Sequence, residues 1–326
     1  MHRESLTREA VRLAYVLLLD REPESEAVID AHLSAHADVA SLRAGFISSP
    51  EYRDRQPSAI DAERDFVQRL ASGYFAAPLP VDVQVSAADA ARLTERIREQ
   101  WTKLGEVDPY WSVLTDDQFH ADRMDKAAED RFHETGAGSA ALIDLTAART
   151  GIAPPTGTCI ELGCGVGRIT RHLASRFDRV IAVDISPGNL ALCRQHLDAT
   201  GVRNVETMLI RDIEELARLP QADYFYSMIV LQHNPPPIQH RMLEILLGRL
   251  RGGGQCLFQT VADLPGYSFE VESYLSTPSP QMEVHCLPMA GIIRLIRAGG
   301  LELDTVRMDS WVSAYGSYTF SAHREG

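Results

Sequence analysis

An apolar strand that runs into a glycine-rich turn and then into a helix is the feature that most limits how this chain can fold. Residues 159–168 read CIELGCGVGR, with glycines at 163, 165 and 167. A tight turn after a strand, a ligand lying against the backbone and a helix that begins close to the sheet each favour a residue without a Cβ atom. The sequence therefore predicts a nucleoside-binding loop at the carboxyl end of a buried strand.

Short apolar runs alternate with helical stretches from residue 158 onward. This alternation is typical of βαβ units and predicts a doubly wound α/β domain with a mostly parallel sheet of seven strands. The expected strands are residues 159–162, 179–183, 205–210, 224–231, 254–260, 301–308 and 317–322.

The residues before this domain are expected to be helical. In residues 6–52 apolar side chains recur at helical spacing, with breaks at Arg21-Glu22-Pro23 and Ser48-Ser49-Pro50, which predicts three short helices. We expect an all-α domain at 1–56, a linker and helical lid at 57–144, and the α/β domain at 145–326. Further predicted elements are helices at 60–72, 86–103 (ended by Gly105), 115–134 and 138–150, and a Pro-containing connector at 76–80.

Carboxylates follow the second and third predicted strands where an adenosine would need them. Asp184 ends the second strand about twenty residues after the glycine loop, where a carboxylate can accept both ribose hydroxyls. After the third strand, Asp212 can accept the adenine amino group and Ile213 can cover the ring. The loop reads G-x-G-x-G rather than the G-x-G-x-x-G of dinucleotide folds, and Glu161 before it would repel a pyrophosphate. An adenosine cofactor without a pyrophosphate is favoured.

The string ELGCGVGR resembles the first motif of class I S-adenosylmethionine-dependent methyltransferases, E-L-G-C-G-x-G-R, and the resemblance covers about residues 145 to 325. It implies S-adenosylmethionine as the cofactor and places Glu161 at the amino-acid end of that molecule. A plain strand-to-helix junction with packing glycines is the alternative. The predicted cofactor contacts are Glu161, Gly163, Cys164, Gly165, Gly167, Arg168, Asp184, Ile185, Asp212, Ile213 and Leu231.

The fourth predicted strand leads to a histidine that suits methyl transfer to an alcohol. Such a transfer needs acceptor, carbon and sulfur in line and is helped by a general base, for which His is the usual choice near neutral pH. His233, in the string VLQHNPP, is the predicted base or acceptor-orienting group, with a structural histidine as the alternative. This string, and WTKLGEVDPYWSVL at residues 101–114, resemble those of bacterial methyltransferases linked to polysaccharide and glycosyl-transfer loci. The resemblance implies O-methylation of a sugar, a glycan intermediate or a similar polar metabolite.

Other functions stay open. Asn234-Pro235-Pro236 resembles the [DN]-P-P-[YF] motif of amino-group methyltransferases, which implies N-methylation of an amine-bearing small molecule or side chain, but Pro237 stands where the motif has an aromatic residue. A non-catalytic, cofactor-binding protein that recruits a partner is a further alternative, and the intact glycine loop and its acids argue against it. A nicotinamide oxidoreductase is least favoured, because the loop has the wrong spacing.

The insert after the fifth predicted strand combines aromatic residues, acids and a histidine, as expected of a segment that covers an acceptor. Tyr267, Glu270 and His285 are therefore predicted substrate contacts, together with Asn234 and Trp111. A packed β-extension with surface charges, and a domain-packing role for the tryptophan, are the alternatives.

One acidic cluster has the composition of a magnesium site. Asp116, Asp117, His120, Asp122 and Asp125 lie within ten residues, but at helical spacing only some of them can converge on one ion. A helix start with acids favoured by the helix dipole is the preferred interpretation, so no metal is predicted.

Charge and cysteine content limit the partners. The formal net charge of the 326 residues is -13, which disfavours nucleic acid, so a small-molecule or glycan acceptor is expected. The five cysteines show no CxxC pair, which predicts neither disulfides nor a zinc cage and favours a reducing cytoplasm. The apolar run at residues 14–19 is too short for a signal peptide or a membrane span. We expect a cytoplasmic protein.

No catalytic or cofactor-binding residue is predicted in the first fifty or so residues. The string AYVLLLDREPESEAVIDAHL, followed by SSPEY, resembles a small helical domain of uncharacterised function that is found in bacterial surface proteins and beside glycosyltransferases. This resemblance makes the domain a candidate for docking a protein partner.

Overall fold

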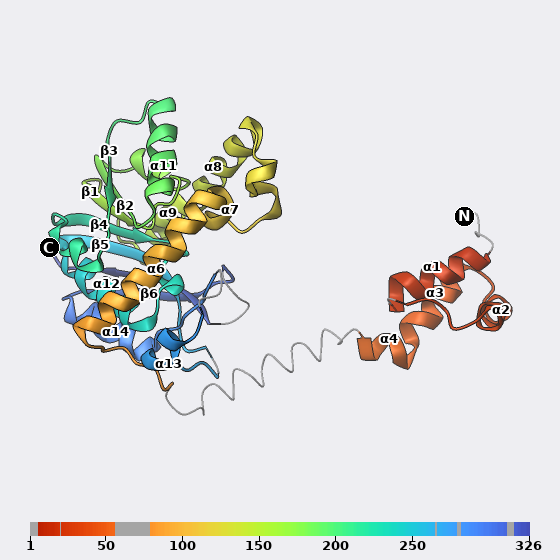
Figure 1. The fold of residues 1–326 in the computed structure, drawn as a ribbon. Coiled ribbons are helices and arrows are strands. Elements are labelled where there is room, and N and C mark those ends of the chain that lie inside the picture. The colour runs from red at the N-terminus through yellow and green to blue at the C-terminus, as the bar shows by residue number, and fades with distance from the viewer. Residues whose placement is uncertain (1–5, 20, 56–78, 265, 279–281, 312–315) are drawn as a thin grey trace. The chain divides into compact units, whose positions relative to one another are not determined.

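The computed structural model describes residues 6–19, 21–55, 79–264, 266–278, 282–311 and 316–326 (Figure 1). Contacts divide the chain into two compact units, Met1–Ala76 and Ala77–Gly326. The helix expected at 60–72 and most of the connector expected at 76–80 lie outside the described residues. Within the described ranges, no helix is both long and apolar enough to cross a membrane.

The described part of the first unit is all helical. The sequence predicted three helices there, separated at 21–23 and 48–50, whereas four are present, because the chain also leaves the helical conformation at 36–38. Pro50 begins the last of the four. Proline is tolerated in the first turn of a helix, where its missing N–H group has no partner to lose. Residues Val11, Tyr15, Leu19, Ile29, Leu42 and Phe46 form the core of this unit. The helices are α1 (Arg8–Leu19), α2 (Glu26–Ala35), α3 (Val39–Ser48) and α4 (Pro50–Arg55).

The second unit is built on a seven-stranded sheet with the order β3-β2-β1-β4-β5-β7-β6. Strands β1 to β5 run parallel, and β7 is antiparallel to both of its neighbours. The strand order reverses between β1 and β4, which confirms the predicted doubly wound fold class. The strands are β1 (Thr158–Leu162), β2 (Arg179–Asp184), β3 (Val205–Leu209), β4 (Ala222–Ser227), β5 (Leu250–Val261), β6 (Glu302–Met308) and β7 (Ser317–His323).

Five strands agree with the predicted bounds to within one residue, and two do not. Strand β5 begins at Leu250 rather than at Gly254, and β4 ends at Ser227 rather than at Leu231. The chain leaves β4 because Ile229 has φ = 58°, in the left-handed region that a β-branched residue rarely adopts. Leu231 then begins the short 3₁₀ helix η4 (Leu231–His233).

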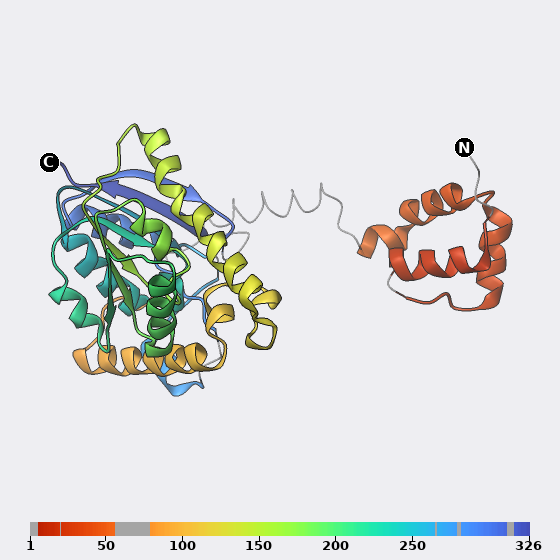
Figure 2. The same cartoon turned by 90° about the horizontal axis from the view of Figure 1, so that it is seen from above.

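Helices cover both faces of the sheet (Figure 2). On one face, α6 (Ala87–Val107), α12 (Pro236–Gly248) and α14 (Met289–Ala298) share a core with the sheet residues Ile160 and Phe225. On the other face, α9 (Leu142–Thr150), α10 (Thr170–Ala174) and α11 (Pro187–Ala199) pack with the end of α8 (Lys126–Ala140) against the opposite sides of β1, β2 and β4. The remaining elements of this unit are α7 (Pro109–Val113), α13 (Val271–Ser276), η1 (Asp117–Phe119), η2 (Ala121–Arg123) and η3 (Ile213–Arg218).

Gly105 does not end its helix, contrary to the prediction. Helix α6 continues to Val107, and Gly105 lies where α6 meets the start of α11. A Cβ atom at this position would lie 2.1 Å from the Ser186 hydroxyl oxygen. Glycine at 105 therefore permits a close contact between two helices rather than ending one.

The helix predicted at 115–134 is also wrong in its first half. Two short 3₁₀ helices, η1 and η2, precede α8, which begins only at Lys126 and then runs past the predicted break to Ala140. The Asp116 carboxylate accepts the Gln118 N–H at 3.1 Å, and the Asp125 carboxylate accepts the Ala128 N–H at 2.7 Å. These two acids of the sequence cluster thus cap helices, as in the preferred interpretation.

We expect Gly136→Ala to destabilise the second unit, and Gly138→Ala not to. A Cβ atom at 136 would lie 1.9 Å from the Arg168 carbonyl oxygen, whereas at 138 no atom lies within 4 Å. Both glycines are inside α8, so both substitutions gain roughly 1 kcal/mol of helix propensity. Overpacking adds a cost of about 1–3 kcal/mol at 136 alone. Thermal unfolding should give a lower midpoint for G136A than for G138A, and equal midpoints would contradict this packing of α8.

Candidate functional site

A cavity of about 300 Å³ lies at the carboxyl ends of β1, β2 and β4. It is lined by residues 162–165 after β1, by Asp184 and Ile185 at the end of β2, and by residues 228–230 after β4. The strand order reverses between β1 and β4, and ligands of doubly wound sheets bind at that point. The volume lies at the lower end of the range of ligand pockets.

The glycine loop is held against the end of β2. The N–H groups of Gly163 and Cys164 both donate to the Val183 carbonyl, at 2.8 and 3.1 Å. Gly163, Gly165 and Gly167 have φ angles of 73°, 54° and 87°. These left-handed values cost little only for glycine, which is why three glycines alternate in this loop.

The loop is also enclosed by its neighbours. A Cβ atom on Gly163 would lie 2.4 Å from a methyl group of Val230, just after β4, and one on Gly165 would lie 2.5 Å from a methyl group of Val113 in α7. Glycine at these two positions therefore leaves room for the protein's own valine side chains.

Asp184 connects the loop to β2. One carboxylate oxygen accepts the Gly165 N–H at 2.8 Å, and the other accepts the Ser186 N–H at 2.8 Å. Burial raises the pKa of this carboxyl, and the N–H groups of Ser186, Gly165 and Ile185 oppose that shift. A carboxylate oxygen has two lone pairs, so each oxygen keeps the capacity to accept a further hydrogen bond. Asp184 can thus hold the loop and accept a pair of ligand hydroxyls together.

Glu161 places a carboxyl group in the wall of the same cavity. Its side chain is buried, and its Oε2 atom has no hydrogen-bond partner within the described part of the chain. Burial raises the pKa of this carboxyl to about 7, against the opposing influence of Thr170 and of the Arg168 guanidinium. Arg168 is itself buried and donates to the hydroxyl of Ser139 in α8 at 3.3 Å. A buried carboxyl with an unpartnered oxygen suits a cationic ligand group.

His233 lies across the cavity with a defined tautomer. Its Nδ1 atom is 2.8 Å from the Glu283 carbonyl oxygen, which can only accept, so Nδ1 carries the proton and Nε2 is the basic nitrogen. Nε2 lies 3.3 Å from the Gln232 amide nitrogen. Burial lowers the pKa of His233, the bond to Glu283 raises it and His285 lowers it, and the net shift is downward. Trp101 packs edge-on against the imidazole, with the ring centroids 5.4 Å apart.

A buried polar network supports Glu283, whose carbonyl orients His233. The Glu283 carboxylate accepts from Arg96 at 3.2 Å and from the hydroxyl of Tyr274, and it pairs with His285 Nε2 at 2.8 Å. Nδ1 of His285 lies 3.0 Å from the hydroxyl of Tyr267. The network contains two of the predicted substrate contacts, and its side chains face one another rather than the cavity.

The structure brings part of the predicted cofactor set together. Glu161, Gly163, Cys164, Gly165, Arg168, Asp184 and Ile185 line the cavity, whereas Gly167, Asp212, Ile213 and Leu231 do not. The Asp212 carboxylate accepts the Glu214 N–H at 2.8 Å and caps η3. Ile213 and Leu231 lie in the hydrophobic core.

The predicted acceptor set is more dispersed. His233 and Asn234 line the cavity, whereas Trp111, Tyr267, Glu270 and His285 do not. Trp111 stacks on His120, with ring centroids 5.0 Å apart, and Glu270 is exposed. The Asn234 amide donates to the Val230 carbonyl at 2.9 Å, so part of its hydrogen-bonding capacity holds the turn after β4.

Sequence reasoning assigned no role to many of the residues that line the cavity. The sequence assigns no site role to Trp101, which begins the string WTKLGEVDPYWSVL, and the structure places it in the cavity lining. Helical periodicity shows that a face of α6 is apolar, but not that part of that face borders a ligand site. The other unassigned lining residues are Ile97, Ser112, Val113, Leu114, Thr115, Leu162, Ile169, Asn189, Ile210, Met228, Ile229, Val230, Met242, Met282, Val284 and Trp311.

The glycine loop after β1 and the acid at the end of β2 meet in one cavity, at the point where the strand order of the doubly wound sheet reverses. Residues 159–254 match the family model described as "Methyltransferase domain". This match lies within the second unit and covers less than a third of the chain.

Curated relatives are similar over a short stretch. The tRNA U34 carboxymethyltransferase of Shewanella baltica (strain OS155 / ATCC BAA-1091) is 35% identical over 105 residues, which are 32% of this chain and 31% of that protein. The protein of the same name from Shewanella sp. (strain ANA-3) is 34% identical over 105 residues, again 32% and 31% of the two chains. This chain thus spans about a third of the length of the curated relatives it matches.

Solved structures are similar at low identity. Magnesium protoporphyrin IX methyltransferase from Synechocystis PCC 6803 with bound SAH superposes with a TM-score of 0.49 at 19% identity, over 71% of this chain and 99% of that one. The complex of DhpI with SAH gives 0.45 at 20% identity, over 74% and 99%.

Proposed function

We propose that this chain is a methyltransferase that uses S-adenosylmethionine to methylate a hydroxyl group of a small polar acceptor, such as a sugar or a glycan intermediate. The observation that carries the proposal is the position of His233. Its imidazole, with Nδ1 protonated and Nε2 as the basic nitrogen, lines the same cavity as Glu161, Asp184 and the glycine loop.

The cofactor side of the cavity matches S-adenosylmethionine group by group. Asp184 would accept the ribose hydroxyls, and the unpartnered oxygen of Glu161 would pair with the ammonium of the amino-acid end. Ile185 and Ile210 line the same cavity and would flank the adenine. When bound, the cofactor supplies a methyl group on a positively charged sulfur.

The acceptor side supports transfer to oxygen. With the cofactor bound, the acceptor hydroxyl would displace the Gln232 amide, which lies 3.3 Å from His233 Nε2. Nε2 would then take the hydroxyl proton as the oxygen bonds to the methyl carbon and the methyl–sulfur bond breaks, and the imidazolium would keep the Nδ1 hydrogen bond to Glu283. Because burial lowers the pKa of His233, the neutral, basic form predominates at neutral pH. Trp101, Met282 and Val284 line the cavity and limit the access of water.

Two observations disfavour the other acceptors. N-methylation through Asn234 is less well supported, because Pro237 stands where the [DN]-P-P-[YF] motif has the aromatic residue that would stack on a planar target. The curated relatives carry tRNA in their names, but this chain has a net charge of -13 and spans about a third of their length. A polyanion is a poor electrostatic match for such a surface.

Transfer of labelled methyl groups to a panel of hydroxylated sugars and of amines tests the proposal. We expect label in the hydroxylated acceptors and a fall in kcat of about 10²–10⁴-fold in His233→Asn, with unchanged affinity for the cofactor. His240→Asn is the matched control, because His240 is part-buried with a lowered pKa but lies outside the cavity lining. If only the amines were labelled, and His233→Asn transferred the label as fast as the unaltered chain, the proposal of a hydroxyl acceptor would be wrong and N-methylation would be favoured.

We expect the affinity for S-adenosylmethionine to rise with pH up to about 7 and then to level off. Burial raises the pKa of Glu161 to about 7, and only the ionised carboxylate pairs with the ammonium of the cofactor. Below that pKa, binding must also release a proton, so affinity falls by up to about tenfold per pH unit. Calorimetry in buffers of different ionisation enthalpy measures the proton release. Glu161→Gln should bind S-adenosylmethionine more weakly and without this pH dependence. If the variant kept the same pH profile, Glu161 would not be the group that pairs with the ammonium.

A further inference from the structure

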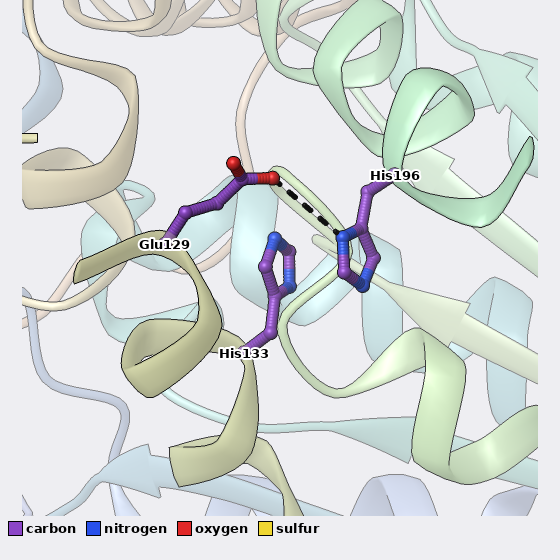
Figure 3. Close-up of side chains that lie close together, drawn as sticks. All are labelled: Glu129, His133 and His196. Carbon is purple, nitrogen blue, oxygen red and sulfur yellow. Dashed lines mark ion pairs between the residues drawn. The ribbon is translucent and has the colours of Figure 1, made fainter. Parts of the chain in front are cut away.

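A group of side chains that could bind a metal ion lies between α8 and α11, outside the cavity lining (Figure 3). Glu129 and His133 are one turn apart on α8, and His196 comes from the last turn of α11. Each offers a ligand atom, and these atoms all lie within 4.8 Å of one another. Oε1 of Glu129 is 3.8 Å from Nδ1 of His196.

The two imidazoles are buried without the hydrogen bonds that such rings normally make. His133 is 0% exposed and His196 is 5% exposed. Among the described residues, neither ring nitrogen of His133 nor Nε2 of His196 has a hydrogen-bond partner. The rings stack face to face, with centroids 3.4 Å apart and planes at 8°. Buried polar atoms rarely lack a bonding partner. Three buried nitrogens without one, in a single place, therefore indicate a partner that is not part of the chain.

The surroundings keep both rings neutral, which is the form that binds metals. Burial lowers the pKa of His133 to about 3, and the pKa of His196 is lowered by burial as well. Of the charged groups that face the pair, Arg171 and Lys126 disfavour a charged imidazole, while Asp130 and Glu129 favour it.

We propose that Glu129, His133 and His196 bind one divalent transition-metal ion of the zinc type. Two imidazole nitrogens and one carboxylate suit Zn²⁺ and Co²⁺, whereas Mg²⁺ and Ca²⁺ prefer oxygen ligands alone. Glu129 is 28% exposed, so a water molecule can complete the coordination.

Binding requires a small adjustment of the side chains. Ligand atoms about 2.0–2.1 Å from a tetrahedral ion lie roughly 3.3 Å from one another, so the three groups must draw together. One imidazole must also turn about its Cβ–Cγ bond, because parallel rings direct their lone pairs in parallel planes. Both movements stay within the side chains and leave α8 and α11 in place.

The ion would join the helical layer to the glycine loop. Helix α8 also carries Gly136, which packs against the Arg168 backbone, and α11 follows the β2 end that contains Asp184. The ion would thus connect α8 to α11, and the proposal is independent of methyl transfer.

Titration of the metal-free full-length chain with Co²⁺ tests the site, because tetrahedral Co²⁺ absorbs strongly in the visible range. We expect one equivalent to bind with such a spectrum, to be displaced by Zn²⁺, and to raise the thermal unfolding midpoint. Glu129→Gln and His196→Gln should weaken binding about a hundredfold or more. Glu129→Gln changes a part-exposed side chain, so it tests the site even if the buried His196 variant does not fold.

His323→Gln is the matched control, since His323 also neighbours two acids, Asp304 and Glu302, but belongs to no such three-residue group in the part of the chain that the structure describes. It should bind Co²⁺ as the unaltered chain does. Absence of a tetrahedral spectrum in the unaltered chain, or unchanged binding in Glu129→Gln, would overturn the proposal and leave the stacked pair as neutral core histidines.

Discussion

Asp184→Ala should weaken the binding of S-adenosylmethionine by about a hundredfold or more. Hydrogen bonds to a charged acceptor contribute about 1.5–3 kcal/mol each, and the variant loses those that the carboxylate makes to two ribose hydroxyls. It also loses the bonds from Gly165 and Ser186, each at 2.8 Å, which hold the loop against β2. Calorimetric titration of both proteins measures the difference directly.

The matched control is Asp178→Ala, an exposed acid just before the opposite end of β2. It should bind the cofactor with unchanged affinity. Circular dichroism of both variants separates loss of binding from loss of the fold. Equal affinities for Asp184→Ala and the unaltered chain would mean that the cofactor does not occupy this end of the sheet.

Gly163→Ala should abolish cofactor binding and cost more stability than an equivalent change elsewhere. Gly163 has φ = 73°, so any side chain is strained there by about 1–2 kcal/mol. The added Cβ atom would also lie 2.4 Å from a Val230 methyl group, which adds about 1–3 kcal/mol of overpacking. Relief of that contact shifts the loop that forms the cavity wall.

Gly201→Ala isolates the backbone effect, because Gly201 has φ = 71° and no atom lies within 4 Å of the added Cβ. This variant should lose only the stability that backbone strain costs, and it should bind the cofactor normally. Val230→Ala in the Gly163→Ala background should recover part of the lost stability. If the two glycine variants unfold at the same denaturant concentration, the contact between the loop and Val230 is not tight.

Local sequence was sufficient to predict the glycine loop after β1, because the geometry of that loop depends on neighbouring residues. The alternating glycines and the acid at the end of the next strand belong to two adjacent strands with parallel register, so their meeting follows from the fold class. Asp212 shows the limit of this reasoning. Strand β3 ends at Leu209, so Ile210 reaches the cavity and Asp212 falls in the turn, where it caps η3.

The positions of the residues predicted to contact an acceptor depend on tertiary contacts, which the periodicity of the sequence does not reveal. The departure of the chain from β4 rests on the left-handed backbone of Ile229, a residue type that predicts a continuing strand. His285 was predicted to face an acceptor, but its partners Glu283 and Tyr267 come together only when the insert folds over α6. His133 and His196 are likewise far apart in sequence and meet only where α8 and α11 cross.

The most direct test of the central claim is calorimetric titration of the purified, full-length chain with S-adenosylmethionine and, separately, with NAD. We predict binding of S-adenosylmethionine at one site per chain and no binding of NAD, because the G-x-G-x-G loop with Glu161 before it repels a pyrophosphate. A folded chain that binds NAD, or that fails to bind S-adenosylmethionine, would contradict the account.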